Sequence, residues 1–234
     1  MKRLALLSLF TLLFFTTAAF AADVVLFYGG DLDLNDPNQN GLANENDAIV
    51  GGNPYGAATY QNFTNSQTWN VHDVFTNNLS QLTPGSGYWE IRSGVSEGNG
   101  GTLVASGTGN VTNTPTGRSD FGYTEYHNEV DGLNVTLAPG TYWVAVVPSC
   151  PTCAGRAFNS DTDGLNSVGS QTSGQQFFNS AFFGANFTNA NNEGVFNIFS
   201  SGVSGTSGVP EPSSLIMLGS GLVAAAGVVR RRLL

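Results

Sequence analysis

The sequence is poor in charged residues, in cysteine and in histidine. Only 11% of its 234 residues are charged, and it has two cysteines and two histidines against 30 glycines. Low charge with much glycine argues against a helical bundle or coiled coil, which needs charge-rich repeats. The formal net charge of −9 argues against a nucleic-acid partner, because proteins that bind nucleic acid present a basic patch.

Catalytic motifs are scarce as well. The sequence has no Gly-x-Ser-x-Gly elbow, no His-Glu-x-x-His and no phosphate-binding loop. Its two histidines are His72 and His127. Two carboxylates could still form a glycosidase pair, but nothing in the sequence selects which two. We therefore expect a non-enzymatic protein with no catalytic residues, and a polysaccharide hydrolase is the less favoured alternative.

The N-terminus has the features of an export signal. Basic residues at positions 2 and 3 precede an apolar run from residue 4 to residue 15, and small residues in an Ala-x-Ala pattern follow. This order is typical of a secretory signal peptide. The prediction is a signal helix over residues 1–21 that is cleaved after Ala21, with an uncleaved membrane anchor as the alternative.

The C-terminus has three parts in order: a proline-containing motif, an apolar stretch and a basic cluster. They are Val209, Pro210, Glu211 and Pro212; then residues 215–229; then Arg230, Arg231 and Arg232. The apolar stretch predicts a transmembrane helix, because terminal arginines can snorkel to the membrane surface. Arginines favour the cytoplasmic side, so the rest of the protein would face away from the cytoplasm.

This tail resembles the PEP-CTERM sorting signal of Gram-negative bacteria over residues 209–234. The resemblance implies anchoring in the inner membrane and then processing by an exosortase, a membrane-embedded enzyme similar to cysteine proteases. It implies delivery to the cell envelope or the extracellular space, in association with exopolysaccharide and biofilm. The same tail occurs on some ice-binding proteins, which alone does not imply ice binding. A plain single-pass anchor is the alternative.

The residues between the two ends carry almost no positive charge. Residues 22–208 contain three arginines and no lysine against 16 acidic residues, a formal charge of −13. Such a domain is repelled by nucleic acid and by anionic membranes or polysaccharides. An acidic polymer could bind only through a bridging cation.

Alternating apolar residues and glycine-rich turns predict an all-β fold. Short strands are expected near residues 24–28, 69–75, 88–92, 102–105, 121–130, 133–137, 141–147, 177–183 and 195–199. Pro139 and Gly140 predict the tight turn of a hairpin. We expect one antiparallel, jelly-roll-like β-sandwich over residues 22–199. The Ser/Gly-rich residues 200–208 are expected to be a flexible linker to the tail.

One loop has the spacing of a calcium site. Counted from residue 36, oxygen-bearing side chains stand at positions 1, 3, 5, 9 and 12, with glycine at position 6 and a backbone carbonyl at position 7. The candidate ligands are Asp36, Asn38, Asn40, Leu42, Asn44 and Asp47. The pattern resembles EF-hand-type loops, and more closely thrombospondin type 3 and dockerin loops. Asparagine in place of aspartate predicts weak binding, and a metal-free Asn/Asp/Gly turn is the alternative.

The remaining candidates have plainer interpretations. Cys150 and Cys153 are the only cysteines, and in an exported chain they predict a disulfide. Glu125, His127 and Glu129 share one face of a strand, where a solvent-facing polar stripe is favoured over a metal or acid–base site. Glu90 and Arg92 also share a face, which predicts a surface ion pair. The tryptophans could form a sugar-stacking platform or belong to the core; they are Trp69, Trp89 and Trp143.

These observations predict an exported structural or adhesive protein of the cell envelope or extracellular matrix. A carbohydrate-binding module for exopolysaccharide is the main alternative.

Overall fold

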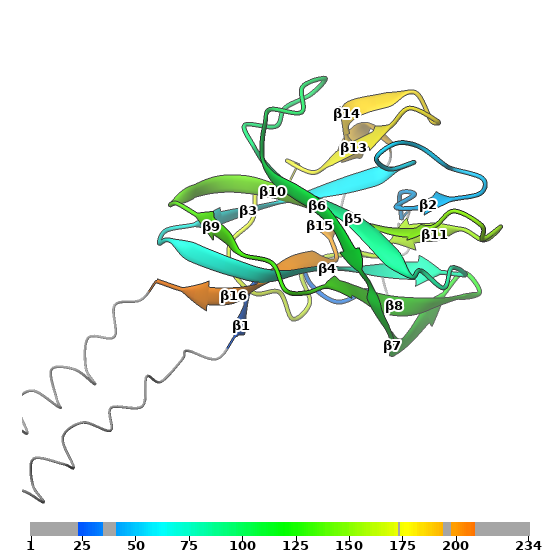
Figure 1. Cartoon of the computed structure of the whole chain (residues 1–234), viewed down its shortest axis with the longest axis horizontal. Helices are drawn as coiled ribbons and strands as arrows, with labels where there is room; N and C mark the ends of the chain where they lie inside the picture. The colour runs from blue at the N-terminus through cyan, green and yellow to red at the C-terminus, as the bar shows by residue number, and fades with distance from the viewer. Residues whose placement is uncertain (1–22, 35–40, 173, 194–197, 209–234) are drawn as a thin grey trace, which may run out of the picture.

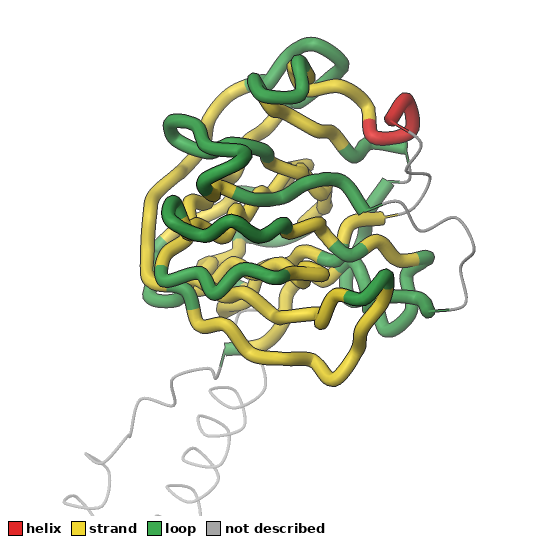
Figure 2. The backbone as a smooth tube through the Cα atoms, turned by 90° about the vertical axis from the view of Figure 1, so that its right-hand side faces the viewer, coloured by secondary structure: helices red, strands yellow, loops and turns green. Residues whose placement is uncertain are grey.

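The structure is a computed structural model that describes residues 23–34, 41–172, 174–193 and 198–208. The expected signal helix and transmembrane helix lie outside these residues. The described chain is built of strands, with one 3-10 turn, η1 (Ala190–Glu193), at the periphery (Figures 1 and 2). The all-β antiparallel prediction is confirmed at this level, and the jelly-roll sandwich stays a prediction.

The first large sheet holds both ends of the described chain. Its order is β1, β16, β4, β8 and β7, and the short strands β9 and β11 also pair with β4. The bounds are β1 (Val24–Tyr28), β16 (Ser201–Ser207), β4 (Trp69–Ser80), β8 (Tyr123–Val130), β7 (Thr112–Asp120), β9 (Val135–Leu137) and β11 (Ala157–Asn159). Every pair in this sheet is antiparallel.

The second large sheet has the order β14, β13, β3, β10, β5 and β6, and β2 pairs with β10 in parallel. The bounds are β14 (Ala185–Asn189), β13 (Phe177–Ser180), β3 (Ala58–Asn65), β10 (Gly140–Cys150), β5 (Ser86–Ser93), β6 (Thr102–Asn110) and β2 (Asn46–Asp47). A small third sheet pairs β12 (Asp161–Thr162) with β15 (Ile198–Phe199).

The main core collects apolar side chains from both large sheets, including Phe27, Phe63, Val74, Ile91 and Val144. Phe27 and Phe63 stack with their ring centroids 5.4 Å apart. These side chains are withdrawn from water, which is the main favourable contribution to folding.

Strand β10 is buried on both faces. Val144 and Val146 point into the main core, while Trp143, Ala145 and Val147 belong to a second cluster with residues of the β13–β14 hairpin. This explains why residues 143–147 form an unbroken apolar run, since a strand covered on both faces has no polar side.

The turn at Pro139 and Gly140 does not close a hairpin, which corrects the prediction. The strand before it, β9, pairs with β4, whereas β10 pairs with β3 and β5, so the turn passes from one sheet to the other. Asn65 holds it there: its Nδ2 donates to the carbonyl of Ala138 (2.9 Å), and its Oδ1 accepts from the amide of Gly140 (3.0 Å). A side chain distant in sequence therefore decides where this turn leads.

Residues 200–208 are not a linker, which corrects a second prediction. Residues 201–207 form β16, which lies between β1 and β4 and bonds to both. A Cβ at Gly202 would collide with the carbonyl of Phe27 and the ring of Phe75, and one at Gly205 would collide with the carbonyl of Asn70. The glycines of this segment thus permit close strand packing rather than flexibility.

Candidate functional site

The tail predicted to sort the protein starts where the fold ends. Ser207 is the last residue of β16, and the amide of Gly208 donates to the carbonyl of Thr68 (2.7 Å). Val24 of β1 lies opposite Gly205 of β16, so the two ends of the described chain leave from the same edge of the molecule (Figure 1). No helix among the described residues is long and apolar enough to span a bilayer.

The predicted calcium ligands divide into two groups. Asp36, Asn38 and Asn40 lie outside the described residues. The carbonyl of Leu42 already accepts from the amide of Asn159 (2.9 Å).

Asn44, at position 9 of the loop, is fully buried. Its Nδ2 donates to the carbonyl of Val146 (2.8 Å), and its Oδ1 accepts from the amide of Thr59 (3.3 Å). The fold therefore uses this side chain internally.

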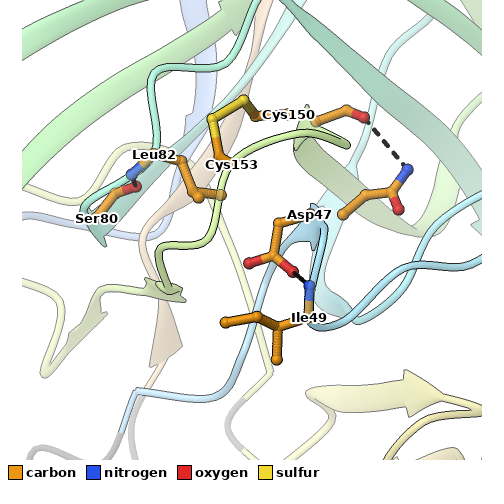
Figure 3. The surroundings of a disulfide bond; sticks show 8 residues. Asp47, Ile49, Ser80, Leu82, Cys150 and Cys153 are labelled. Carbon is orange, nitrogen blue, oxygen red and sulfur yellow. Dashed lines mark hydrogen bonds between the residues drawn. A yellow bond between two sulfur atoms is a disulfide. The ribbon is translucent and has the colours of Figure 1, made fainter.

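Asp47, the last ligand of the loop, caps a turn beside the disulfide (Figure 3). Its Oδ1 accepts from the amides of Ile49 (2.7 Å) and Val50 (2.6 Å), and its buried Oδ2 has no hydrogen-bond partner among the described residues. Cys150, which pairs with Asp47 in register, is joined to Cys153 by a disulfide with a Cα–Cα distance of 5.3 Å.

Nowhere in the described ranges do three or more His, Cys, Asp or Glu side chains gather closely enough to hold a metal ion. The calcium hypothesis stays a prediction that rests on Asp36, Asn38 and Asn40.

All three arginines of the described chain bind buried glutamates. The pairs are Arg92 with Glu90, Arg118 with Glu125, and Arg156 with Glu45, at Nε–Oε distances of 2.5, 2.5 and 2.8 Å. The three glutamates are at most 1% exposed. A buried carboxylate needs such a partner, because an unpaired buried charge is strongly unfavourable. The described domain is therefore left with no lysine or arginine free to attract an anionic partner.

The Glu90 pair is not a surface pair, which corrects the prediction. Glu90 accepts from four donors: Nε and an Nη of Arg92, the hydroxyl of Tyr88 (2.9 Å) and the hydroxyl of Tyr60. Tyr60 is itself fully buried on β3. Burial, followed by the charge of Glu90, raises the pKa of Tyr60 well above its usual value, so Tyr60 keeps its proton and donates it.

A chain of hydrogen bonds leads from Glu90 to the surface. The hydroxyls of Tyr60 and Tyr55 are 2.8 Å apart, and Nδ2 of Asn179 lies 2.7 Å from the hydroxyl of Tyr55. Since the proton of Tyr60 is committed to Glu90, Tyr55 must donate to Tyr60, and Asn179 must donate to Tyr55. The order of donors is therefore fixed by the carboxylate at the inner end.

The chain ends at a surface groove of about 410 Å³. Two elements line it: the loop before β3, which contains the cis Asn53–Pro54 peptide bond, and the β13–β14 hairpin. The lining residues are Asn53, Pro54, Tyr55, Asn179, Ala181, Gly184, Ala185 and Asn186. None of them carries a charge, and three offer side-chain amides, so the groove suits an uncharged hydrogen-bonding ligand.

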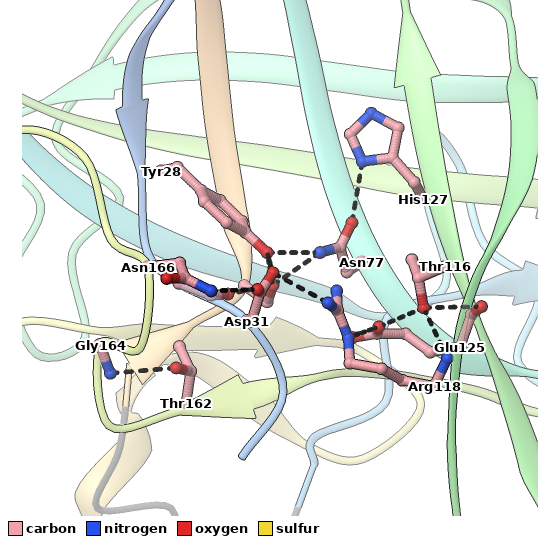
Figure 4. A network of polar contacts seen from close by, with 12 residues as sticks. Tyr28, Asp31, Asn77, Thr116, Arg118, Glu125, His127, Thr162, Gly164 and Asn166 are labelled. Carbon is pink, nitrogen blue, oxygen red and sulfur yellow. Dashed lines mark hydrogen bonds and ion pairs between the residues drawn. The ribbon is translucent and has the colours of Figure 1, made fainter. Parts of the chain in front are cut away.

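A second buried network surrounds Glu125 (Figure 4). Oε2 of Glu125 accepts from Nε of Arg118 (2.5 Å) and from the hydroxyl of Thr116 (2.6 Å). The other side of Arg118 reaches Oδ1 of Asp31 at 3.1 Å. Tyr28 also donates to Asp31 (2.7 Å), so the network joins the loop after β1 to the β7–β8 hairpin.

The predicted polar stripe on β8 is only partly exposed, which corrects that interpretation. Glu125 is fully buried, while His127 and Glu129 are each 32% exposed. His127 lies 2.9 Å from Oδ1 of Asn77, whose Nδ2 donates to Tyr28. Burial lowers the pKa of His127 below its usual value; the charge of Glu125 opposes this shift, and that of Arg118 adds to it. His127 thus joins the network of Glu125 through Asn77 and Tyr28.

The three tryptophans are core residues. Trp69, Trp89 and Trp143 are between 6% and 9% exposed, so they do not form the sugar-stacking platform considered from the sequence. Exposed aromatic rings lie elsewhere. Phe182 (57% exposed) and Phe183 (46%) form the tip of the β13–β14 hairpin, and they stand in the chain between Ala181 and Gly184, which line the groove.

Sequence reasoning missed the groove because its parts are far apart in the chain. The segment before β3 and the β13–β14 hairpin lie more than 100 residues apart, and the pairing of β3 with β13 brings them together. The one local signal is the pair of phenylalanines at residues 182–183; the strand predicted over residues 177–183 ends at Ser180, and residues 181–184 form a turn.

Comparison with known families identifies the tail. The family model of the PEP-CTERM protein-sorting motif matches residues 208–232. The match spans the Pro-Glu-Pro element and the arginine cluster, which lie outside the described residues. The chain therefore carries a PEP-CTERM sorting motif, which implies export, membrane anchoring and processing by an exosortase. No curated protein matches the chain.

Proposed function

We propose that the protein is an exported, non-enzymatic component of the cell envelope or extracellular matrix that acts with exopolysaccharide. The observation that supports this best is the sorting motif at residues 208–232, which directly follows the last strand of the domain. The motif supplies delivery, and the β-rich domain, which we propose to be a jelly-roll sandwich, is what is delivered.

The charge distribution supports an extracellular role of this kind. Each arginine of the described domain is bound to a buried glutamate, so the outward charge is negative. Such a surface favours solubility and disfavours adsorption to anionic polymers. A partner in the matrix would therefore be an uncharged polymer or another protein.

The position of β16 limits where the exosortase can act. Because β16 pairs with β4 over residues 201–207 and with β1 over residues 202–205, a cut within it would remove part of an interior strand. Processing that preserves the domain must therefore occur beyond Ser207. The proposal thus places the cut within the matched motif rather than in a linker.

Deleting residues 210–234 tests the proposal. The truncated protein should be exported freely, without envelope retention or exosortase-dependent processing, because the motif is gone while β16 remains complete. Fractionation and immunoblotting would measure this, and an exosortase-deficient strain carrying the intact chain is the matched control. Identical localisation and processing with and without the tail would contradict the proposal.

A carbohydrate-binding module is the second candidate, favoured by the uncharged groove with its three asparagines. A polysaccharide hydrolase is less favoured, because the buried glutamates are already paired with arginines; turnover of a polysaccharide by the purified protein would establish it. Calcium at the Asp36 loop is tested by calorimetric titration, where no heat at several millimolar calcium would end that hypothesis.

A further inference from the structure

The geometry points to the groove between the pre-β3 loop and the β13–β14 hairpin as a binding site for an uncharged polysaccharide, with Asn179 as its central acceptor and Phe182 as its aromatic platform. This site rests on the proposed function in the matrix and adds the ligand class and the residues that recognise it.

Asn179 is held in one orientation by the buried network beneath it. Its Nδ2 donates inward to Tyr55, in a chain that ends on the carboxylate of Glu90. Because Nδ2 is committed to Tyr55, Oδ1 is the amide atom left for a ligand, and Asn179 lines the groove. An acceptor fixed in this way suits a ligand hydroxyl, because its orientation costs no entropy on binding.

The groove also offers a donor and acceptor surface of amides. Nδ2 of Asn186 donates to the carbonyl of Gly98 (3.2 Å), so its Oδ1 is the atom left for a ligand, and Asn53 completes the wall. Hydroxyl-rich ligands fit such a lining, since each hydroxyl both donates and accepts. An ionic ligand does not fit it, because no charged side chain lines the groove.

The two phenylalanines between the groove residues Ala181 and Gly184 are fixed by ring contacts. The rings of Phe182 and Phe183 meet edge to face with centroids 4.9 Å apart, and Phe183 also contacts the ring of Phe178 at 6.0 Å. The guanidinium of Arg156 lies 5.9 Å from the ring of Phe183. The contact with Phe183 thus supports the exposed ring of Phe182, and the apolar face of a sugar ring can stack on it.

The charge of the domain selects among polysaccharides. Residues 22–208 contain 16 acidic residues and three arginines, and each of the three arginines is paired with a glutamate of the same domain. The domain therefore repels anionic polymers at long range. The ligand class is therefore the neutral polysaccharides.

Affinity electrophoresis of the full chain in neutral detergent tests the site. Native gels would contain glucomannan or dextran as neutral probes, alginate as the acidic probe and gelatin as the peptide probe. We expect a neutral polysaccharide to retard the protein and alginate and gelatin not to. The assignment would be overturned if neither neutral probe retarded the protein, or if alginate or gelatin retarded it as strongly as the neutral probes do.

Matched variants locate the binding. Asn179→Ala and Phe182→Ala should each weaken retardation at least tenfold, whereas Phe121→Ala, which removes an exposed ring (65%) from the β7–β8 turn, should not change it. Because Phe182 is exposed, its removal leaves the fold intact, which melting curves would check. Retention of full binding by both groove variants would contradict the site.

A second pair of matched variants tests the chain of hydrogen bonds that runs from Glu90 to Asn179. Tyr60→Phe removes the hydroxyl that orients Tyr55 and Asn179, and it should weaken binding several-fold. Tyr28→Phe removes a hydroxyl from the Glu125 network and should leave binding unchanged at a comparable loss of melting temperature. Equal effects of the two variants on binding would show that Tyr60 is not a positioning residue. Groove variants should still localise as the wild type does, so failure here is distinguishable from failure of the sorting proposal.

Discussion

The networks around Glu90 and Glu125 each start from a glutamate paired with an arginine, but they lead to different parts of the molecule. Both carboxylates are buried and bound by one arginine. Both carboxylate oxygens of Glu90 accept hydrogen bonds, and two of the donors are tyrosine hydroxyls. Oε1 of Glu125, in contrast, has no hydrogen-bond partner among the described residues. A carboxylate with donors on both oxygens can orient groups beyond itself, while Glu125 relies on the arginine and the threonine that reach its other oxygen.

The two networks also differ in what they connect. The Glu90 network runs through Tyr60 and Tyr55 to a groove open to solvent. The Glu125 network runs through Arg118 to Asp31 and ties two segments of the first sheet together. We interpret the first as support for a binding surface and the second as a structural tie.

Removing the arginine should give the largest effect. Arg118→Met leaves both Glu125 and Asp31 without their cation, and we expect a loss of about 3–5 kcal/mol in the free energy of unfolding. Arg92→Met is the matched change, and it should cost less because Tyr60 and Tyr88 still donate to Glu90. Chemical denaturation measures both. A larger loss in the free energy of unfolding for Arg92→Met than for Arg118→Met would contradict the view that Glu125 depends more on its arginine than Glu90 does.

The third pair extends the comparison to pH. Burial is the main cause that raises the pKa of Glu45, in spite of donation from Ala157 and Arg156. A carboxyl with a raised pKa in the folded state binds its proton more tightly there, so the free energy of unfolding should fall as pH rises above the ordinary value of 4.5. Glu45→Gln should flatten this fall. Denaturation midpoints from pH 4 to pH 7 would check it, with Glu97→Gln as the exposed control; an unchanged slope would contradict the assignment.

His127 should give the smallest effect, confined to the Glu125 side. Its pKa is lowered in the folded state, chiefly by burial. The unfolded chain therefore binds the proton more readily below pH 6.5, and stability should fall as pH decreases from that value. The expected change in melting temperature is on the order of 1–2 °C, and His127→Gln should abolish it. Amide exchange should show the loss in β8 and not in β5; equal loss in both strands would argue against a local origin.

The apolar strand β1 was predictable, whereas β3 with its two buried amide side chains was not. β1 has the predicted bounds, residues 24–28. β3 was missed because Gln61 and Asn62 are fully buried on it, and their partners lie elsewhere in the chain: Oε1 of Gln61 accepts from the amide of Phe199 (2.8 Å). A polar residue that is satisfied at long range has no local signature.

The buried glutamates illustrate the same limit. Alternation correctly placed Glu90 and Arg92 on one face, but it could not show that Tyr60 and Tyr88 cover that face. Glu125 and Arg118 become neighbours only through the pairing of β7 with β8. The scarcity of arginine was visible in the sequence, and it is the structure that shows each arginine to be committed to a buried partner.

The pairing of β16 on both sides has a mechanical consequence. While the protein is held by its tail, any pull on the domain enters at Gly208 and runs along β16, against two rows of backbone hydrogen bonds, one to β1 and one to β4. These rows are loaded together in shear rather than opened one bond at a time. The segment predicted to be a flexible linker, β16, is therefore the part of the domain that bears the pulling force.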